Sequence, residues 1–115
     1  MSANSIAREK SMAFAIRIVW LCQHLCSERK EFVLSKQILR SGTSIGANIT
    51  EAVYGSSRKD FAAKLRIALK ECAETLYWLE LLHACDYLPD NLYESLLGDC
   101  EELRRILVAS IKSCG

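Results

Sequence analysis

Apolar residues recur along this chain at spacings of three and four, in four separate stretches. This spacing places them on one side of an α-helix, because 3.6 residues complete each turn. The stretches run from about residue 5 to 28, 35 to 54, 58 to 85 and 91 to 113. No stretch shows the strict apolar–polar alternation of a half-buried strand. Three short connections join the four segments, which predicts an all-α, up-down-up-down antiparallel four-helix bundle.

Each segment has its own apolar face. In the first segment, Met12, Ile16, Val19, Gln23 and Cys26 share one side. The corresponding faces are Leu34, Ile38, Ile45, Ile49 and Ala52 in the second segment; Phe61, Leu65, Ala68, Cys72, Thr75, Leu79 and Leu82 in the third; and Leu96, Cys100, Leu103, Leu107 and Ile111 in the fourth. Ser35 is expected to cap the second helix and Ser57 the third.

The third segment is apolar on more than one side. Beyond the face given above it carries Ile67, Trp78 and Leu81. A helix that packs on one side only has a narrower apolar stripe. The surplus indicates either wide coverage of the bundle core or a contact with another subunit, in which Trp78 and Trp20 would be the anchors.

Two glycines, Gly42 and Gly46, lie inside the second predicted helix. Each costs about 1 kcal/mol relative to alanine there. We therefore expect either a bend or a neighbour that presses against the helix backbone.

A row of polar residues occupies another side of the same helix, and it is the best site candidate in the sequence. The row comprises Lys36, Arg40, Ser44, Asn48 and Glu51, with Lys70, Glu71 and Glu74 on the third segment as its candidate partners. Salt bridges and hydrogen bonds among these residues are the simplest expectation. A ligand-binding role is the alternative.

The 115 residues suffice for one domain, predicted to span residues 1–115. Half of the residues are hydrophobic and the net charge is +1, so the whole molecule shows no electrostatic preference for nucleic acid or membrane. The charges are unevenly distributed. Residues 1–30 hold five Lys or Arg against two Asp or Glu, and residues 86–115 hold three against six. Either the terminal helices lie side by side, or Arg8, Lys10, Arg29 and Lys30 form a basic patch.

Neither a membrane span nor a secretory signal is visible, because the longest apolar stretch is interrupted by polar residues and the N-terminus lacks a cleavage pattern. A cytoplasmic location is expected. Most of the six cysteines fall on apolar helical positions, where a reduced thiol acts as a small apolar side chain.

Catalytic and metal-binding patterns are weak. Cys22 and Cys26 are one turn apart, but no further ligand converges on them, and no histidine stands three positions after Glu51, Glu71 or Glu74. Residues 42–46 match the pattern G-x-S-x-G, but that motif requires a strand before the serine. No metal, cofactor, small-molecule substrate or enzymatic activity is therefore expected.

Basic residues concentrate at the start of the third segment. They are Arg58, Lys59, Lys64 and Arg66, with Phe61 among them and with Asp60 diluting the positive field. This is either a solvated helix face or a nucleic-acid contact, and the second alternative predicts binding that weakens steeply with salt.

The two central segments, residues 34–52 and 60–79, resemble a family of bacterial four-helix-bundle proteins. Its founding members are encoded by intervening sequences within 23S ribosomal RNA genes. The resemblance covers about residues 12–112. It is carried by Arg40, Ser41, Gly42, Ser44, Ile45, Asn48, Glu51, Lys70, Glu71, Glu74 and Trp78.

The resemblance implies a small cytosolic bundle that forms a homopentameric ring and has no enzymatic activity. A related accessory protein of diversity-generating retroelements binds a reverse transcriptase and nucleic acid, so the resemblance also implies RNA, DNA or a reverse transcriptase as partners. The leading hypothesis is a self-associating interaction protein that presents a polar or basic surface to an RNA or protein. The alternative is a nucleic-acid-binding accessory factor to a ribonucleoprotein or a reverse transcriptase.

Overall fold

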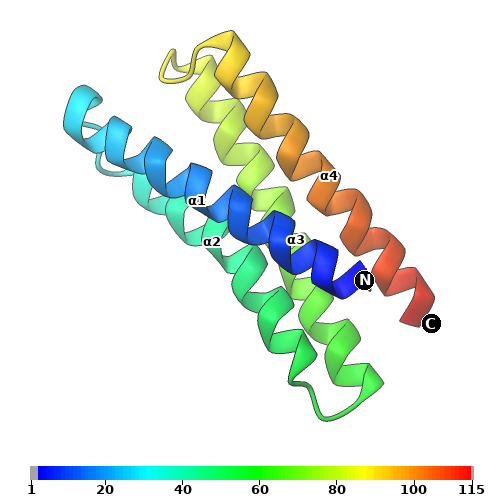
Figure 1. Cartoon of the computed structure of the whole chain (residues 1–115). Helices are drawn as coiled ribbons and strands as arrows, with labels where there is room; N and C mark the ends of the chain where they lie inside the picture. The colour runs from blue at the N-terminus through cyan, green and yellow to red at the C-terminus, as the bar shows by residue number, and fades with distance from the viewer. Residues whose placement is uncertain (1–2, 115) are drawn as a thin grey trace.

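The structure is a computed structural model and describes residues 3–114. This part of the chain contains four α-helices. They are α1 (Ala3–Arg29), α2 (Leu34–Val53), α3 (Arg58–Ala84) and α4 (Asp90–Cys114). Figure 1 shows them running alternately up and down, with both chain ends at one end of the bundle. The predicted antiparallel four-helix bundle is confirmed, with every helix boundary within two residues of its predicted position. Residues 1, 2 and 115 of the predicted domain lie outside the described part.

Each helix packs against two others. Helix α1 contacts α2 and α4, and α3 contacts the same two helices, so that α1 and α3 lie diagonally opposite. The bundle measures 44 × 21 × 21 Å. Within residues 3–114 no helix has the length and apolar content needed to cross a membrane.

The predicted core faces of α2, α3 and α4 are correct. Their members form one cluster with the buried residues of α1, and most of them are less than 3% exposed: Ile38, Ile45, Ile49, Ala52, Leu65, Ala68, Cys72, Thr75, Leu79, Leu82, Leu96, Cys100, Leu103 and Leu107. Their spacing of three and four keeps one stripe of each helix directed at the bundle axis. Leu34, Phe61 and Ile111 pack at the margin of this cluster.

The predicted face of α1 is wrong. Met12, Ile16 and Val19 are 64%, 41% and 37% exposed. The buried stripe of α1 is instead formed by Ala7, Ser11, Phe14, Ile18, Leu21, Cys22 and Leu25. Both sets follow helical spacing, and periodicity alone does not say which of two apolar stripes faces the core.

The glycines of α2 meet α1 at close range. A Cβ atom built on Gly42 would lie 3.0 Å from Cγ1 of Ile18, and one on Gly46 would lie 3.0 Å from Oγ of Ser11. Helix α2 continues without interruption through both positions. The expected neighbour is therefore α1, and the absent side chains allow the two helices to approach each other.

The sequence suggested Ser35 as the cap of α2, but the side chain of Glu31 caps the start of this helix. Oε2 of Glu31 accepts hydrogen bonds from the backbone N–H groups of Val33 and Leu34, both at 3.0 Å, and Oε1 accepts one from Ser35 at 2.8 Å. Ser35 lies inside the helix, and its hydroxyl donates to the carbonyl oxygen of Glu31. The serine cap predicted for α3 is correct, since Oγ of Ser57 accepts from the N–H of Asp60 at 3.1 Å.

The opposite charges of the two terminal helices face each other. Lys10 pairs with Glu102 at 3.3 Å and Arg17 with Asp99 at 2.6 Å, linking α1 to α4. This confirms that the terminal helices lie side by side. Exposed pairs of this kind contribute up to about 1 kcal/mol each, so they align the helices more than they stabilise the fold.

Candidate functional site

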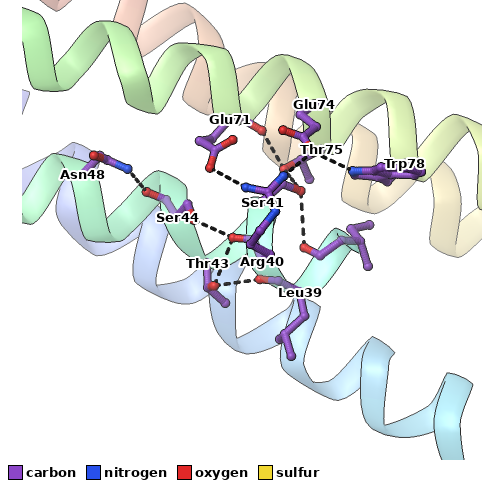
Figure 2. A network of polar contacts seen from close by, with 11 residues as sticks. Leu39, Arg40, Ser41, Thr43, Ser44, Asn48, Glu71, Glu74, Thr75 and Trp78 are labelled. Carbon is purple, nitrogen blue, oxygen red and sulfur yellow. Dashed lines mark hydrogen bonds and ion pairs between the residues drawn. The ribbon is translucent and has the colours of Figure 1, made fainter. Parts of the chain in front are cut away.

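The predicted polar row lies along the line where α2 meets α3 (Figure 2). The guanidinium of Arg40 donates from Nη1 to Oε2 of Glu71 at 3.0 Å and from Nη2 to Oε1 of Glu74. Oε1 of Glu74 also accepts from the indole N–H of Trp78 at 3.2 Å. Four of the residues singled out in the sequence are thus brought into one network, which joins the middle of α2 to the middle of α3.

This network holds its charges in the ionised state. The hydrogen bond from Arg40 lowers the pKa of Glu74 below its usual value, and the indole donor of Trp78 acts in the same direction. The hydrogen bond to Glu74 in turn raises the pKa of Arg40. A carboxylate held ionised by a permanent cation is a poor general acid, and the arrangement is suited to cross-linking two helices.

The other members of the row are engaged within the bundle. Oγ of Ser44 donates to the carbonyl oxygen of Arg40 at 2.6 Å, and Nδ2 of Asn48 donates to that of Ser44 at 2.8 Å. Glu51 pairs with Lys64 of α3 at 3.0 Å. Lys36 and Lys70 are exposed on α2 and α3. The structure therefore supports the simpler expectation, a salt-bridged contact between two helices.

A buried polar pair that the sequence did not indicate lies behind this row. The hydroxyls of Ser41 and Thr75 are 2.9 Å apart and neither residue is exposed. Oγ1 of Thr75 also lies 2.7 Å from the carbonyl oxygen of Glu71. Oγ of Ser41 lies 3.5 Å from the carbonyl oxygen of Ile38, so the hydroxyl contact and two backbone carbonyls together take up the two protons of the pair. Both residues occupy positions that the helical pattern assigns to the core, so the sequence did not identify them as a hydrogen-bonded pair.

The basic residues of α3 lie on more than one side of the helix. Arg58, Lys59 and Arg66 are exposed, whereas Lys64 is turned toward α2 and its pair with Glu51. Lys64 and Arg66 are two positions apart and thus point about 200° from each other around the helix. Lys59 and Arg66 are seven positions apart and lie in nearly the same direction, so the positive field is divided between that outward side and the side that faces α2.

Metal and thiol chemistry receive no support from the described residues. Among residues 3–114, no three His, Cys, Asp or Glu side chains are grouped closely enough to hold a metal ion. Cys22 donates from Sγ to the carbonyl oxygen of Ser35, and burial raises the pKa of its thiol to about 11. Contact with Cys72 and burial also raise the pKa of Cys100. Thiols with raised pKa values are unreactive, because the thiolate is the nucleophile.

The predicted subunit contact on α3 is only partly exposed. Ile67 is 44% exposed, whereas Trp78 and Leu81 are half-buried and Trp78 packs against the bundle core. The surplus apolar face thus contributes both to the core and to the surface. Tyr77, which the sequence analysis had not selected, is 57% exposed on the same side of the bundle as Leu81.

An apolar hollow lies elsewhere, on the outer side of α1 and α2. This groove has a volume of about 1100 Å³. Met12 and Ile16 of α1 form one wall, and the small residues Thr43, Gly46 and Ala47 of α2 form the floor. Sequence reasoning missed it because it had assigned Met12 and Ile16 to the core.

The chain is similar to proteins of one family over most of its length. A family model described as 23S rRNA-intervening sequence protein matches residues 3–109. A solved structure from Bacteroides thetaiotaomicron VPI-5482, described as a protein with unknown function from the S23 ribosomal protein family, has 53% sequence identity and a TM-score of 0.95. The match covers 96% of this chain and 99% of that chain. No curated protein matches this chain.

Proposed function

The chain belongs to the family of 23S rRNA-intervening sequence proteins, and we propose that it is a non-enzymatic interaction protein that assembles with copies of itself. The observation that carries the proposal is the exposure of large apolar side chains in the middle of helices. Trp20 is 65% exposed, Met12 64% and Tyr77 57%. Met12 and Trp20 lie on α1 with Ile16 and Val19, which are also exposed, and an apolar patch of this kind marks a site of association.

The polar row supports a non-enzymatic role. Its acids are paired with Arg40 and Lys64, and its hydroxyl and amide groups donate to backbone carbonyls of their own helix. A catalytic acid or base needs a free position for substrate and a pKa near the working pH. The proposal extends to a cytoplasmic location, supported by Cys22, Cys72 and Cys100 serving as core side chains.

Light scattering coupled to size-exclusion chromatography tests self-assembly directly. One chain has a mass of 12.9 kDa. At micromolar concentration we expect a particle of several chain masses, and the family resemblance points to a ring of five. A particle of one chain mass at every concentration up to 100-fold higher would refute the proposal.

A second candidate function is nucleic-acid binding, favoured by the exposed cations of Arg58, Lys59 and Arg66 at the start of α3. Phosphate contacts release counterions, so affinity for a single-stranded RNA should fall steeply with salt. Fluorescence anisotropy with a labelled RNA between 20 and about 200 mM salt measures this slope. Absence of binding at the lowest salt concentration would eliminate this function and leave self-assembly unaffected.

A further inference from the structure

The outward side of α3 carries three cations and an aromatic ring, all of them exposed. They are Lys59, Arg66, Lys70 and Tyr77, and we call them the α3 basic stripe. Their spacings of seven, four and seven place them within an arc of about 40° around the helix axis. This arc lies about 160–180° from the fully buried Ala68, so it points away from the bundle axis. At 1.5 Å per residue the stripe is about 27 Å long.

The positive charge of the α3 basic stripe is not neutralised by the protein. Within residues 3–114 none of its three cations forms an ion pair. The acids nearest to the stripe in direction are Glu74 and Glu80, each about 40° outside the arc. Glu74 is bound by Arg40, and Glu80 lies about 15 Å along the axis from Lys70. Three uncompensated positive charges therefore face solvent on one side of one helix.

The aromatic ring at the end of the stripe is exposed and yet held in place. Tyr77 is 57% exposed, and its ring makes an edge-to-face contact with that of Trp78, with the centroids 5.0 Å apart and the planes at 70°. The indole N–H of Trp78 donates to Glu74, which also accepts from Arg40 (Figure 2). The polar row thus fixes the side chain against which the tyrosine ring packs.

A line of cations with an aromatic ring matches the chemistry of a single-stranded nucleic acid. Lysine and arginine bind its phosphates whatever the sequence, and unpaired bases stack on exposed aromatic rings. A duplex keeps its base faces stacked on one another, so it would use the cations and leave the ring without a role. An acidic peptide would likewise engage the cations alone.

We propose that the α3 basic stripe binds single-stranded nucleic acid, with its three cations on phosphates and Tyr77 stacked on a base. This inference rests on the nucleic-acid binding given above as the second candidate function, and it specifies the surface and the form of the ligand. Lys64 is not part of this surface, because it pairs with Glu51 at 3.0 Å. Lys70, half a stripe further along α3, takes part in its place.

The α3 basic stripe is compatible with self-assembly through α1. Helices α1 and α3 each contact α2 and α4 and do not contact each other. Their outward sides therefore point away from each other, as their diagonal positions in Figure 1 indicate. A chain that associates through the exposed apolar residues of α1 still presents the stripe to a ligand.

The variant that combines Arg66→Gln with Lys70→Gln tests the phosphate contacts. Fluorescence anisotropy with a labelled oligouridine of about 16 nucleotides gives the affinity between about 50 and 200 mM salt. Each phosphate contact to a single strand contributes about 0.7 to the slope of log affinity against log salt, so this variant should lower the slope by about 1.4. The matched control combines Arg105→Gln with Lys36→Gln, which removes the same two charges from exposed positions on α4 and α2 and should keep the slope.

Tyr77→Leu tests the stacking contact separately. Loss of one base–aromatic stack should weaken the binding of oligouridine about 5- to 150-fold without changing the salt slope, whereas Tyr77→Phe keeps the ring and should bind like the unmodified chain. Duplexed oligouridine–oligoadenosine should bind more weakly and be insensitive to Tyr77→Leu. Phosphates and base faces are common to RNA and DNA, so oligodeoxythymidine should show the same losses. The substituted residues are exposed, so each variant should keep its circular dichroism and melting temperature.

The possible failures are distinguishable. If the unmodified chain binds no oligouridine at the lowest salt concentration, nucleic-acid binding itself is wrong and this inference falls with it. If the chain binds but the control pair lowers the slope as much as Arg66→Gln with Lys70→Gln, binding reflects overall charge and only this inference is wrong. The same conclusion follows if Tyr77→Leu binds like the unmodified chain, if the duplex binds as tightly as the single strand, or if oligoglutamate competes as well as unlabelled oligouridine.

Discussion

The contact between Gly42 of α2 and Ile18 of α1 allows a sharp test of how the bundle is packed. The perturbation is Gly42→Ala, which adds one methyl group to α2. That methyl would lie 3.0 Å from Cγ1 and 3.1 Å from Cγ2 of Ile18, closer than carbon atoms pack. Ile18 has no exposed surface, so it cannot turn away into solvent. Gly98→Ala is the matched control, since a Cβ there would have no neighbour within 4 Å.

Two opposing effects determine the size of the change. Replacing glycine by alanine inside a helix favours folding by about 1 kcal/mol, and this gain applies equally to both variants. Overpacking a buried contact costs about 1–3 kcal/mol, and this applies only to Gly42→Ala. We therefore expect Gly98→Ala to raise the melting temperature by about 4 °C. Gly42→Ala should be less stable than Gly98→Ala by about 1–3 kcal/mol.

Urea denaturation at one fixed protein concentration measures both free energies of unfolding, so that assembly affects the variants equally. A double-mutant cycle with Ile18→Ala isolates the contact, because that substitution removes the two atoms nearest the added methyl. Ile18→Ala should be less destabilising when combined with Gly42→Ala than in the unmodified protein. Equal stability of Gly42→Ala and Gly98→Ala, or a coupling below about 0.3 kcal/mol, would refute a close approach at this point.

Three further predictions concern the cap, the polar row and the thiols. Glu31→Ala leaves three N–H groups at the start of α2 without their acceptor and should lower the free energy of unfolding by about 1–2 kcal/mol in urea; an unchanged midpoint would mean that water replaces the carboxylate. Arg40 lowers the pKa of Glu74, so the ionised pair stabilises the fold above pH 4.5. This contribution is lost as the pH falls further and Glu74 becomes protonated. Glu74→Gln should therefore make the free energy of unfolding less dependent on pH in acid. In iodoacetamide labelling at pH 8 followed by mass spectrometry, exposed Cys85 should react well before Cys22, whose pKa is about 11; equal rates would contradict the burial of Cys22.

Helix number, topology and most of the core could be predicted from the sequence, since these depend on local spacing and on few breakers. In α3, every position from Leu65 to Leu82 that the spacing of three and four selected is buried. The glycine positions also predicted a close contact correctly, because a glycine inside a helix has a cost that needs a reason. That α1 supplies this contact depends on the packing of the helices and could not be deduced from α2 alone.

The polar row shows a different limit. The spacing predicted that its residues lie together, because positions 40, 44, 48 and 51 share one side of a helix. Spacing gives the direction of a side chain but not its partner, so a ligand site and a salt-bridged helix contact have the same sequence pattern. The structure supplies the partners, through the 3.0 Å contact of Arg40 with Glu71 and its pairing with Glu74.

The wrong assignment in α1 carries the most functional information. A helix that packs on one side of a small bundle requires a single apolar stripe. Phe14, Ile18 and Leu25 form this stripe, and none of them is more than 1% exposed. Folding therefore gives no reason for the second stripe, which includes Met12 and Trp20. An apolar side chain kept in water adds no packing to the fold and raises the risk of aggregation, so a second stripe of regular spacing beside a groove supports the self-association proposed above. The stripe that the bundle does not use for its own core is thus the surface on which we place the proposed contact between copies.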